Sequence, residues 1–260
     1  MTRWAAAVEY LGTRYSGWQI QATRPSVQGE LETALSSVAD RPVATICAGR
    51  TDAGVHALGQ VVHFDTDAVR SPYAWLLGVN SRLPSEVSLR WVQPAPEDFD
   101  ARRSATSRRY RYVIHNHRAR AALLGGRATW IPHALDAEVM HRAAQALLGE
   151  NDFSAFRASE CQSNTPMRNL QEIRLFRRGD FVVLDIRANA FLHHMVRNIM
   201  GVLIEIGQSR RGEPWAGELL ADRDRTQGGI TAPAEGLYFI GPEYPERFAI
   251  PGPAHPWFPA

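Results

Sequence analysis

Apolar positions along the chain follow strand and helix spacings in turn, and the same order of elements is predicted twice. In the first hundred residues, strand-like runs at 4–10, 43–47, 60–64 and 87–92 surround two segments with helical spacing, one after Ser26 and one at 72–81. Serine is a common helix N-cap. The apolar positions of the first helix are Val27, Leu31, Ala34, Leu35 and Val38. This half is predicted to be a β-α-β-β-α-β unit.

The second half repeats the order. Strands are predicted at 109–115, 170–176, 181–186 and 236–240, with one helix capped by Asp136 and a longer helix at 192–206. Two ferredoxin-like β-α-β-β-α-β units can join edge to edge, so the predicted fold is α+β with a continuous, mainly antiparallel sheet. The predicted units cover 1–100 and 101–241, and the proline-rich tail at 242–260 is expected to form an extended strap.

Composition narrows the function classes. The chain has 260 residues, of which 45% are apolar and 22% charged, and it has no apolar run long enough to cross a membrane. Its two cysteines, Cys47 and Cys161, form no paired motif, which argues against a disulfide framework or a cysteine zinc site and favours the cytoplasm. All 29 basic residues are arginine, so chemistry that needs a lysine amine is excluded.

The arginines are unevenly distributed. Residues 101–135 contain no Asp or Glu, although the whole chain has a net charge of only +2. The arginines of this segment are Arg102, Arg103, Arg108, Arg109, Arg111, Arg118, Arg120 and Arg127, and Tyr110, Tyr112 and Trp130 lie among them. Cations with interleaved aromatic rings suit a polyanion surface such as RNA. The alternative is a solvated loop whose charges pair with acids elsewhere in the fold.

The sharpest local feature is the glycine-flanked segment 48–57, which contains Arg50 and Asp52 between two predicted strands. Glycines at 49 and 54 permit unusual backbone angles and the close approach of a ligand. A carboxylate in this position can act as a nucleophile, a general base or a metal ligand. Taken alone, the segment favours an Asx-turn in which Asp52 binds nearby backbone amides.

The long predicted helix carries a second feature. Arg197 lies about 100° from its apolar stripe, and burying an unpaired guanidinium is costly. A carboxylate partner is therefore expected, although a surface arginine with its charged end in solvent fits the pattern as well. The neighbouring His193 and His194 are expected to point apart on the same helix, so that they cannot share a metal ion.

These segments together resemble the TruA-type tRNA pseudouridine synthases. The similarity rests on six ordered blocks between about residues 5 and 241, the most specific being Cys47-Ala48-Gly49-Arg50-Thr51-Asp52-Ala53-Gly54-Val55-His56. The others include Tyr15-Ser16-Gly17-Trp18-Gln19, Arg109-Tyr110-Arg111-Tyr112, Phe191-Leu192-His193-His194-Met195-Val196-Arg197-Asn198 and Thr231-Ala232-Pro233-Ala234-Glu235-Gly236-Leu237.

The resemblance implies a cytoplasmic homodimer that isomerises uridine to pseudouridine at positions 38, 39 and 40 of the tRNA anticodon arm, without metal or cofactor. Asp52 matches the catalytic aspartate of the family, and Arg197 matches the arginine that pairs with it. Tyr110 matches the tyrosine that stacks on the target base. Arg50 matches an arginine that holds the flipped nucleotide, and Leu237 falls in a block near the uracil pocket.

Two other classes of protein remain open on the residues themselves. A non-catalytic RNA-binding protein with two ferredoxin-like units accounts for the basic segment but not for the turn that carries Asp52. A hydrolytic nucleosidase accounts for Asp52 but not for the long arginine-rich stretch. Release of tritium from C5 of uridine distinguishes them, because only isomerisation replaces that proton.

Overall fold

The computed structural model describes residues 1–161 and 163–252, which divide into two compact units. Unit 1 contains residues 1–108 and 238–252, and unit 2 contains residues 109–237. The α+β class with mainly antiparallel strand pairing is confirmed. Each unit places its helices against its own strands, and each is described separately.

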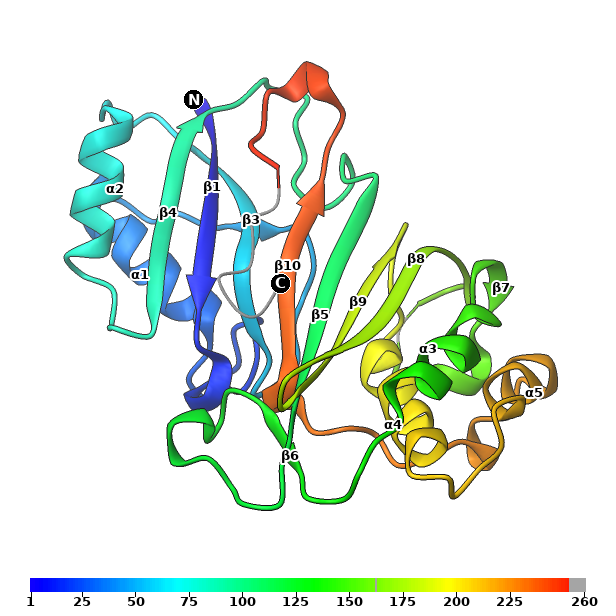
Figure 1. The fold of residues 1–260 in the computed structure, drawn as a ribbon. Helices are drawn as coiled ribbons and strands as arrows, with labels where there is room; N and C mark the ends of the chain where they lie inside the picture. Colours follow the sequence, from blue (N-terminus) through cyan, green and yellow to red (C-terminus); the bar gives the residue numbers. More distant parts are fainter. Residues whose placement is uncertain (162, 253–260) are drawn as a thin grey trace. The chain divides into compact units, whose positions relative to one another are not determined.

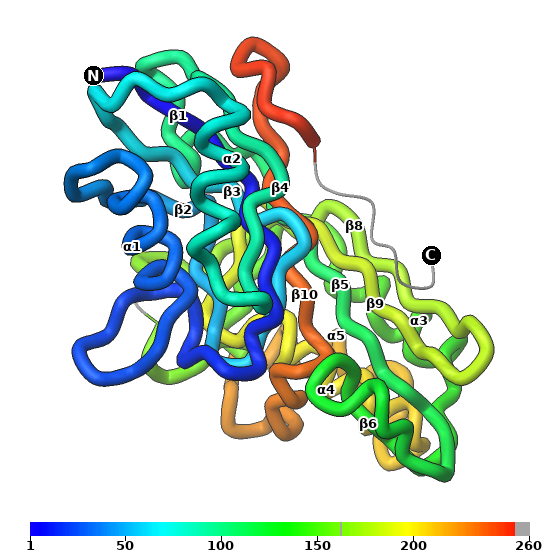
Figure 2. Tube along the Cα trace, turned by 90° about the vertical axis from the view of Figure 1, so that its left-hand side faces the viewer, coloured from blue at the N-terminus to red at the C-terminus, as the bar shows by residue number. Residues whose placement is uncertain are grey.

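Unit 1 follows the predicted order β1 (Thr2–Tyr10), α1 (Val27–Ala39), β2 (Ile46–Cys47), β3 (His56–Thr66), α2 (Pro72–Asn80) and β4 (Val87–Pro94). Strand β1 pairs antiparallel with both β3 and β4. The final strand β10 (Leu237–Glu243) returns to run parallel to β3, with Tyr238 opposite His56. Helices α1 and α2 lie next to one another against these strands (Figure 1 and Figure 2).

The helix signals read from the sequence are confirmed in unit 1. Ser26 caps α1 by accepting a hydrogen bond from the Gly29 N–H at 3.2 Å, and Asp40 ends the helix in the left-handed region. The helix buries Val27, Leu31, Ala34 and Leu35. Burying such side chains contributes about 1.5–3 kcal/mol each, which fixes this face of α1 on the sheet.

One predicted strand is shorter than expected. Strand β2 covers only Ile46–Cys47, because the side chains of α1 bind the backbone donors before it. The Val43 N–H donates to Ser36 Oγ at 2.9 Å, and the Thr45 N–H donates to Glu32 Oε1 at 2.7 Å. Those amides are therefore not free to extend the pairing with β3.

The chain after β10 packs on unit 1 as far as it is described. Phe248 is buried and lies edge-on to Phe99, with ring centroids 5.3 Å apart. The Tyr244 hydroxyl donates to the Ala101 carbonyl oxygen at 2.7 Å, and the Ser107 hydroxyl binds the Glu243 carboxylate at 2.6 Å. The part of the predicted strap at 253–260 lies outside the described residues.

Unit 2 contains most of β5 (Ser107–Asn116), then β6 (Thr129–Ile131), α3 (Ala137–Gln145), β7 (Gly149–Asp152), β8 (Met167–Arg178), β9 (Phe181–Ala188), α4 (Met195–Gly207) and α5 (Trp215–Asp222). Its strands follow the order β5-β9-β8-β7, and β8 and β9 form the predicted hairpin. Helices α3 and α4 pack side by side (Figure 1), joined by the Asp136 N–H and the Gly207 carbonyl oxygen at 2.9 Å. The sequence analysis did not predict β6, β7 or α5.

The start of the long helix also differs from the prediction. Helix α4 begins at Met195 and not at residue 192, because His194 takes the left-handed conformation with φ of 60°. His193 and His194 therefore precede the helix, and the expectation that they diverge on a helical surface is wrong. Their ring centroids lie 4.0 Å apart.

Candidate active site

The turn that carries Asp52 lies in unit 1, between β2 and β3. It closes through the backbone, where the Val55 N–H donates to the Asp52 carbonyl oxygen at 3.1 Å. Gly54 takes φ of +79°, a region that favours glycine, and this explains the second glycine of the motif. The Asp52 side chain is partly buried and the Arg50 side chain is exposed, so the turn presents a carboxylate and a cation together.

A segment near the N-terminus binds the backbone of this turn.

 The Trp18 N–H donates to the Thr51 carbonyl oxygen at 3.0 Å, and the Gly54 N–H donates to the Tyr15 carbonyl oxygen at 3.3 Å. These two bonds hold the turn from both sides of Asp52. The segment 15–18 is thus a brace for the turn, a role that the sequence analysis did not assign to it.

Gly17 explains why this brace fits so closely. Its φ is +100°, and a Cβ added there would lie 2.7 Å from the Thr51 carbonyl oxygen and 3.2 Å from the Asp52 carbonyl carbon. A side chain at this position would therefore push the backbone of the turn away. The glycine in the block 15–19 was visible in the sequence, but its contact with residues 51 and 52 was not.

The other end of the turn is anchored on β3. The Ala48 N–H donates to the Val61 carbonyl oxygen at 2.8 Å, and the Gln60 side chain binds the Gly49 backbone. The Arg108 guanidinium donates to the Ala48 carbonyl oxygen at 3.2 Å. The backbone before Arg50 and Asp52 is therefore held on three sides, which limits the freedom of both side chains.

Unit 2 positions Arg197 on the first turn of α4. Its Nε donates to the Ala232 carbonyl oxygen at 2.8 Å, and the Ala232 N–H donates to the Arg197 carbonyl oxygen at 3.1 Å. The side chain is partly buried, and the acceptor of its Nε is a backbone oxygen; the carboxylate partner expected from the sequence stays a prediction. So does the pairing of Arg197 with Asp52, a residue of unit 1.

Tyr110 lies on β5 and is 8% exposed. Its ring meets Phe191 edge-on, with centroids 5.0 Å apart and an interplanar angle of 84°. Such a contact contributes about 0.5–1.5 kcal/mol beyond the buried area and fixes the ring orientation. Packing in a strand and stacking on a substrate base both fit this position, so its role at the base stays a prediction.

Leu237 begins β10 directly after the short 3₁₀ helix Ala234–Gly236 and is buried. A Cβ on Gly236 would lie 2.7 Å from the Tyr112 ring and 2.6 Å from Thr129 Oγ1. The glycine before Leu237 is therefore required for the close approach of this segment to β5. The Tyr112 hydroxyl donates to the Pro233 carbonyl oxygen at 2.7 Å, and burial raises the pKa of Tyr112 above its usual range.

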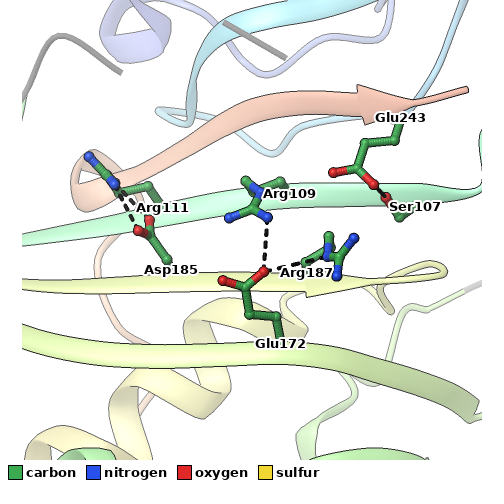
Figure 3. A network of polar contacts seen from close by, with 7 residues as sticks. All are labelled: Ser107, Arg109, Arg111, Glu172, Asp185, Arg187 and Glu243. Carbon is green, nitrogen blue, oxygen red and sulfur yellow. Dashed lines mark hydrogen bonds and ion pairs between the residues drawn. The ribbon is translucent and has the colours of Figure 1, made fainter. Parts of the chain in front are cut away.

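Part of the basic segment pairs with acids, as the alternative interpretation expected. Arg111 is 5% exposed and binds both carboxylate oxygens of Asp185 at 2.7 Å, and Arg109 binds Glu172 at 2.9 Å (Figure 3). Arg187 also approaches Glu172, at 3.6 Å. Arg109 and Arg111 therefore stabilise the strands of unit 2.

Other arginines of this segment face solvent. The exposed ones are Arg102, Arg103, Arg118, Arg120 and Arg127. Within the described residues, Arg118 and Arg120 form no ion pair. The surface available to a polyanion is thus carried by fewer arginines than the sequence count indicates.

No helix in the described part of the chain is long and apolar enough to cross a membrane. A solved structure described as a complex of Cbf5, Nop10 and Gar1 matches with a TM-score of 0.35 and 10% identity, over 91% of this chain and 48% of that chain. A likeness of that size carries no conclusion about function.

Comparison by sequence is far more specific. A family model described as tRNA pseudouridine synthase matches residues 6–102 and 143–245. The tRNA pseudouridine synthase A proteins of Escherichia fergusonii and Salmonella paratyphi B are each 57% identical to this chain over 249 residues, which is 96% of this chain and 92% of theirs. The match includes both the braced turn of unit 1 and the Arg197 helix of unit 2. The chain therefore belongs to the tRNA pseudouridine synthase family.

Proposed function

We propose that the protein isomerises uridine to pseudouridine at positions 38, 39 and 40 of the tRNA anticodon arm, with Asp52 acting at the target ribose. The observation that carries the proposal is the fixed position of Asp52 on a turn braced by Tyr15 and Trp18, in a chain of this family. A partly buried carboxylate on a rigid backbone can be held close to one reacting atom of a bound substrate.

The chemistry needs one carboxylate near C1′ of the ribose. The C1′–N1 bond breaks, the uracil rotates, and a new C1′–C5 bond forms before the C5 proton leaves. No sugar oxygen departs, so no second acid has to protonate a leaving group. Asp52 either attacks C1′ as a nucleophile or removes the C2′ proton to give a glycal, and both routes use the same position of the carboxylate.

The remaining residues hold the substrate. The target nucleotide has to leave the stack before a side chain can reach its ribose. The ring of Tyr110 stacks on the flipped uracil, the exposed Arg50 holds the nucleotide in that position, and Leu237 contacts the base. Arg197 pairs with the Asp52 carboxylate and orients it.

The proposal includes a homodimer in the cytoplasm. The reaction redistributes bonds within one substrate, so this mechanism calls for neither a metal ion nor a cofactor. The exposed arginines Arg102, Arg103 and Arg118 support binding of an RNA backbone, because guanidinium groups without acidic partners suit phosphates.

The test is release of tritium from tRNA labelled at C5 of uridine. Isomerisation at positions 38–40 releases tritium from a transcript labelled there, and the product strand stays intact. An RNA-binding protein without activity releases nothing. A nucleosidase leaves an abasic site and free labelled uracil. Transcripts with a single labelled uridine at 38, 39 or 40 show which position is modified, and size-exclusion chromatography with light scattering gives the oligomeric state.

A further inference from the structure

Unit 2 contains a cavity of about 350 Å³ that the proposed reaction does not use. Its wall is formed by the end of β5, the segment 120–130 and the chain just before Leu237. The residues that define it are His115, Arg120, Leu124, Thr129, Trp130 and Glu235. The volume lies at the lower end of the range of small-ligand sites, about 300–1,000 Å³.

His115 is the first indication that something binds there. It is 7% exposed, and its Nδ1 is buried without a hydrogen-bond partner in the part of the chain that the structure describes. Its ring lies between His117 and Phe181, with both centroid distances 5.7 Å, so it is held in place. A buried nitrogen without a partner is costly. A ligand in the cavity would satisfy it after a small movement of the wall, because Nδ1 itself has almost no accessible surface.

The other walls indicate the chemistry of that ligand. The Trp130 ring is 40% exposed, and its Nε1 donates to the His117 carbonyl oxygen at 2.8 Å, which fixes the indole. Arg120 is exposed and forms no ion pair within the described residues. Glu235 adds a carboxylate to the lining. Aromatic surfaces together with hydrogen-bond donors and acceptors are typical of sites for unpaired RNA bases.

We propose that this cavity binds an unpaired base of the substrate RNA. The base stacks against Trp130, its polar edge binds His115 Nδ1, and Arg120 contacts its phosphate. This inference rests on the proposed function, because it assumes that RNA is the substrate. It adds a second base contact, separate from the target uridine.

The cavity is linked to the candidate active site through one segment of chain. Pro233 lines the cavity, and its carbonyl oxygen accepts the Tyr112 hydroxyl at 2.7 Å. The preceding residue, Ala232, accepts from Arg197 Nε at 2.8 Å. A base bound in the cavity therefore contacts the same segment that orients Arg197.

The first experiment compares tRNA affinity among three variants. His115→Phe replaces the imidazole by an apolar ring without nitrogens, and Arg120→Gln removes the cation in the wall. Arg142→Gln is the control outside the cavity, because the exposed Arg142 already pairs with Glu213 at 3.0 Å. We expect His115→Phe and Arg120→Gln to raise the Kd for tRNA about tenfold, the loss that one charged or buried hydrogen bond produces. Arg142→Gln should change the Kd clearly less at the same salt concentration.

The second experiment observes the cavity directly. The protein is labelled at its histidine Cε1 positions, and the His115 resonance is identified by its absence in His115→Phe. AMP, GMP, CMP and UMP are titrated in turn, with inorganic phosphate as the control. At least one nucleotide should shift the His115 resonance, and inorganic phosphate should not. A shift with phosphate alone would overturn the base site in favour of an anion site.

The inference and the proposed function can fail separately. Loss of the proposed function appears as no tritium release by the wild-type protein, whether or not it binds tRNA and whatever the variants do. The inference is overturned if the wild-type protein is active while His115→Phe binds tRNA normally and no nucleotide shifts the His115 resonance. Equal weakening by Arg142→Gln and Arg120→Gln would likewise remove the role of Arg120. A weakened dimer with normal tRNA binding would assign the cavity to a second copy of the chain.

Discussion

The hydroxyl groups of Tyr10 and Thr51 lie 2.7 Å apart in the interior of unit 1. This bond connects the end of β1 to the residue that precedes Asp52. Both side chains are buried, at 3% and 7% exposure, so the hydrogen bond is shielded from water. Together with the backbone bonds of Tyr15 and Trp18, it makes the position of Asp52 depend on the first eighteen residues of the chain.

Tyr10→Phe tests this dependence. The change removes one buried hydroxyl and leaves Thr51 without that partner, which should lower the free energy of unfolding by about 1–2 kcal/mol. We expect kcat for tRNA isomerisation to fall while KM changes little. The Asp52 carboxylate is held in position less precisely, whereas the RNA-binding surface of the protein is unchanged. The control is Tyr73→Phe, whose ring is 71% exposed. Equal kcat values for the two variants would show that the bond does not position Asp52.

Gly17→Ala tests the close approach of the brace. Alanine at φ of +100° is strained, and its Cβ would lie 2.7 Å from the Thr51 carbonyl oxygen. Gly179→Ala is a matched control, because Gly179 also has a positive φ but no atom within 4 Å of the added Cβ. Gly179→Ala should lower the free energy of unfolding by about 1 kcal/mol, from the strained backbone alone. Gly17→Ala should lower the stability measured by thermal unfolding clearly more than the control does, and it should also slow isomerisation. An equal loss of stability in the two variants would contradict the brace.

Much of the fold could be predicted from local signals. Ser26 and Asp136 cap helices as expected, since capping depends on a side chain and amides two or three residues away. The hairpin of β8 and β9 also follows from local alternation. Strand β2 could not be bounded, because Glu32 and Ser36 on another element bind its neighbouring amides.

The sequence pointed to the residues of the candidate site, but it did not predict the contacts that hold them in place. The turn with Asp52 stands out by its glycines, whereas the bonds from Tyr15 and Trp18 use backbone atoms that every residue has. The partner of Arg111 is Asp185, and no local pattern relates two residues on separate strands. The sequence therefore indicated the chemistry more directly than the framework that holds it.

Asp52→Asn should abolish isomerisation while leaving tRNA affinity within a few fold. The substitution keeps the size of the side chain and removes its charge, and the backbone brace does not involve the carboxylate. The melting temperature should change by less than about 4 °C, the shift that 1 kcal/mol produces in a chain of this size. Single-turnover tritium release and tRNA binding measure the two effects. Appreciable release by the purified variant would contradict the assignment of Asp52.

Arg111 and Arg118 should behave in opposite ways. Arg111→Met leaves the largely buried Asp185 carboxylate without its partner, which should cost about 3–5 kcal/mol of stability. It should not change the slope of log affinity against log salt, measured below the melting temperature. Arg118→Ala should leave stability within about 0.5 kcal/mol and flatten that slope by about 0.7–0.9 if the side chain contacts one phosphate.

The double variant Arg111→Met with Asp185→Leu is the control for this pair. Replacing both charges by apolar groups should restore most of the lost stability, because no buried charge is left alone. A salt slope that changes in Arg111→Met would show that this arginine meets the RNA after all. An unchanged slope in Arg118→Ala would remove its phosphate contact.

Two variants of Tyr110 distinguish a packing role from a role in the reaction. Its ring is 8% exposed and lies edge-on to Phe191, a contact that Tyr110→Phe keeps and Tyr110→Leu loses at a cost of about 0.5–1.5 kcal/mol. If the ring stacks on the uracil and its hydroxyl takes the C5 proton, Tyr110→Phe should bind tRNA normally but release tritium slowly, and Tyr110→Leu should lose both. Single-turnover release and tRNA affinity are measured for both variants. A fully active Tyr110→Phe would remove the proton role and leave stacking, whereas normal binding and release by Tyr110→Leu would reduce Tyr110 to a packing residue of β5.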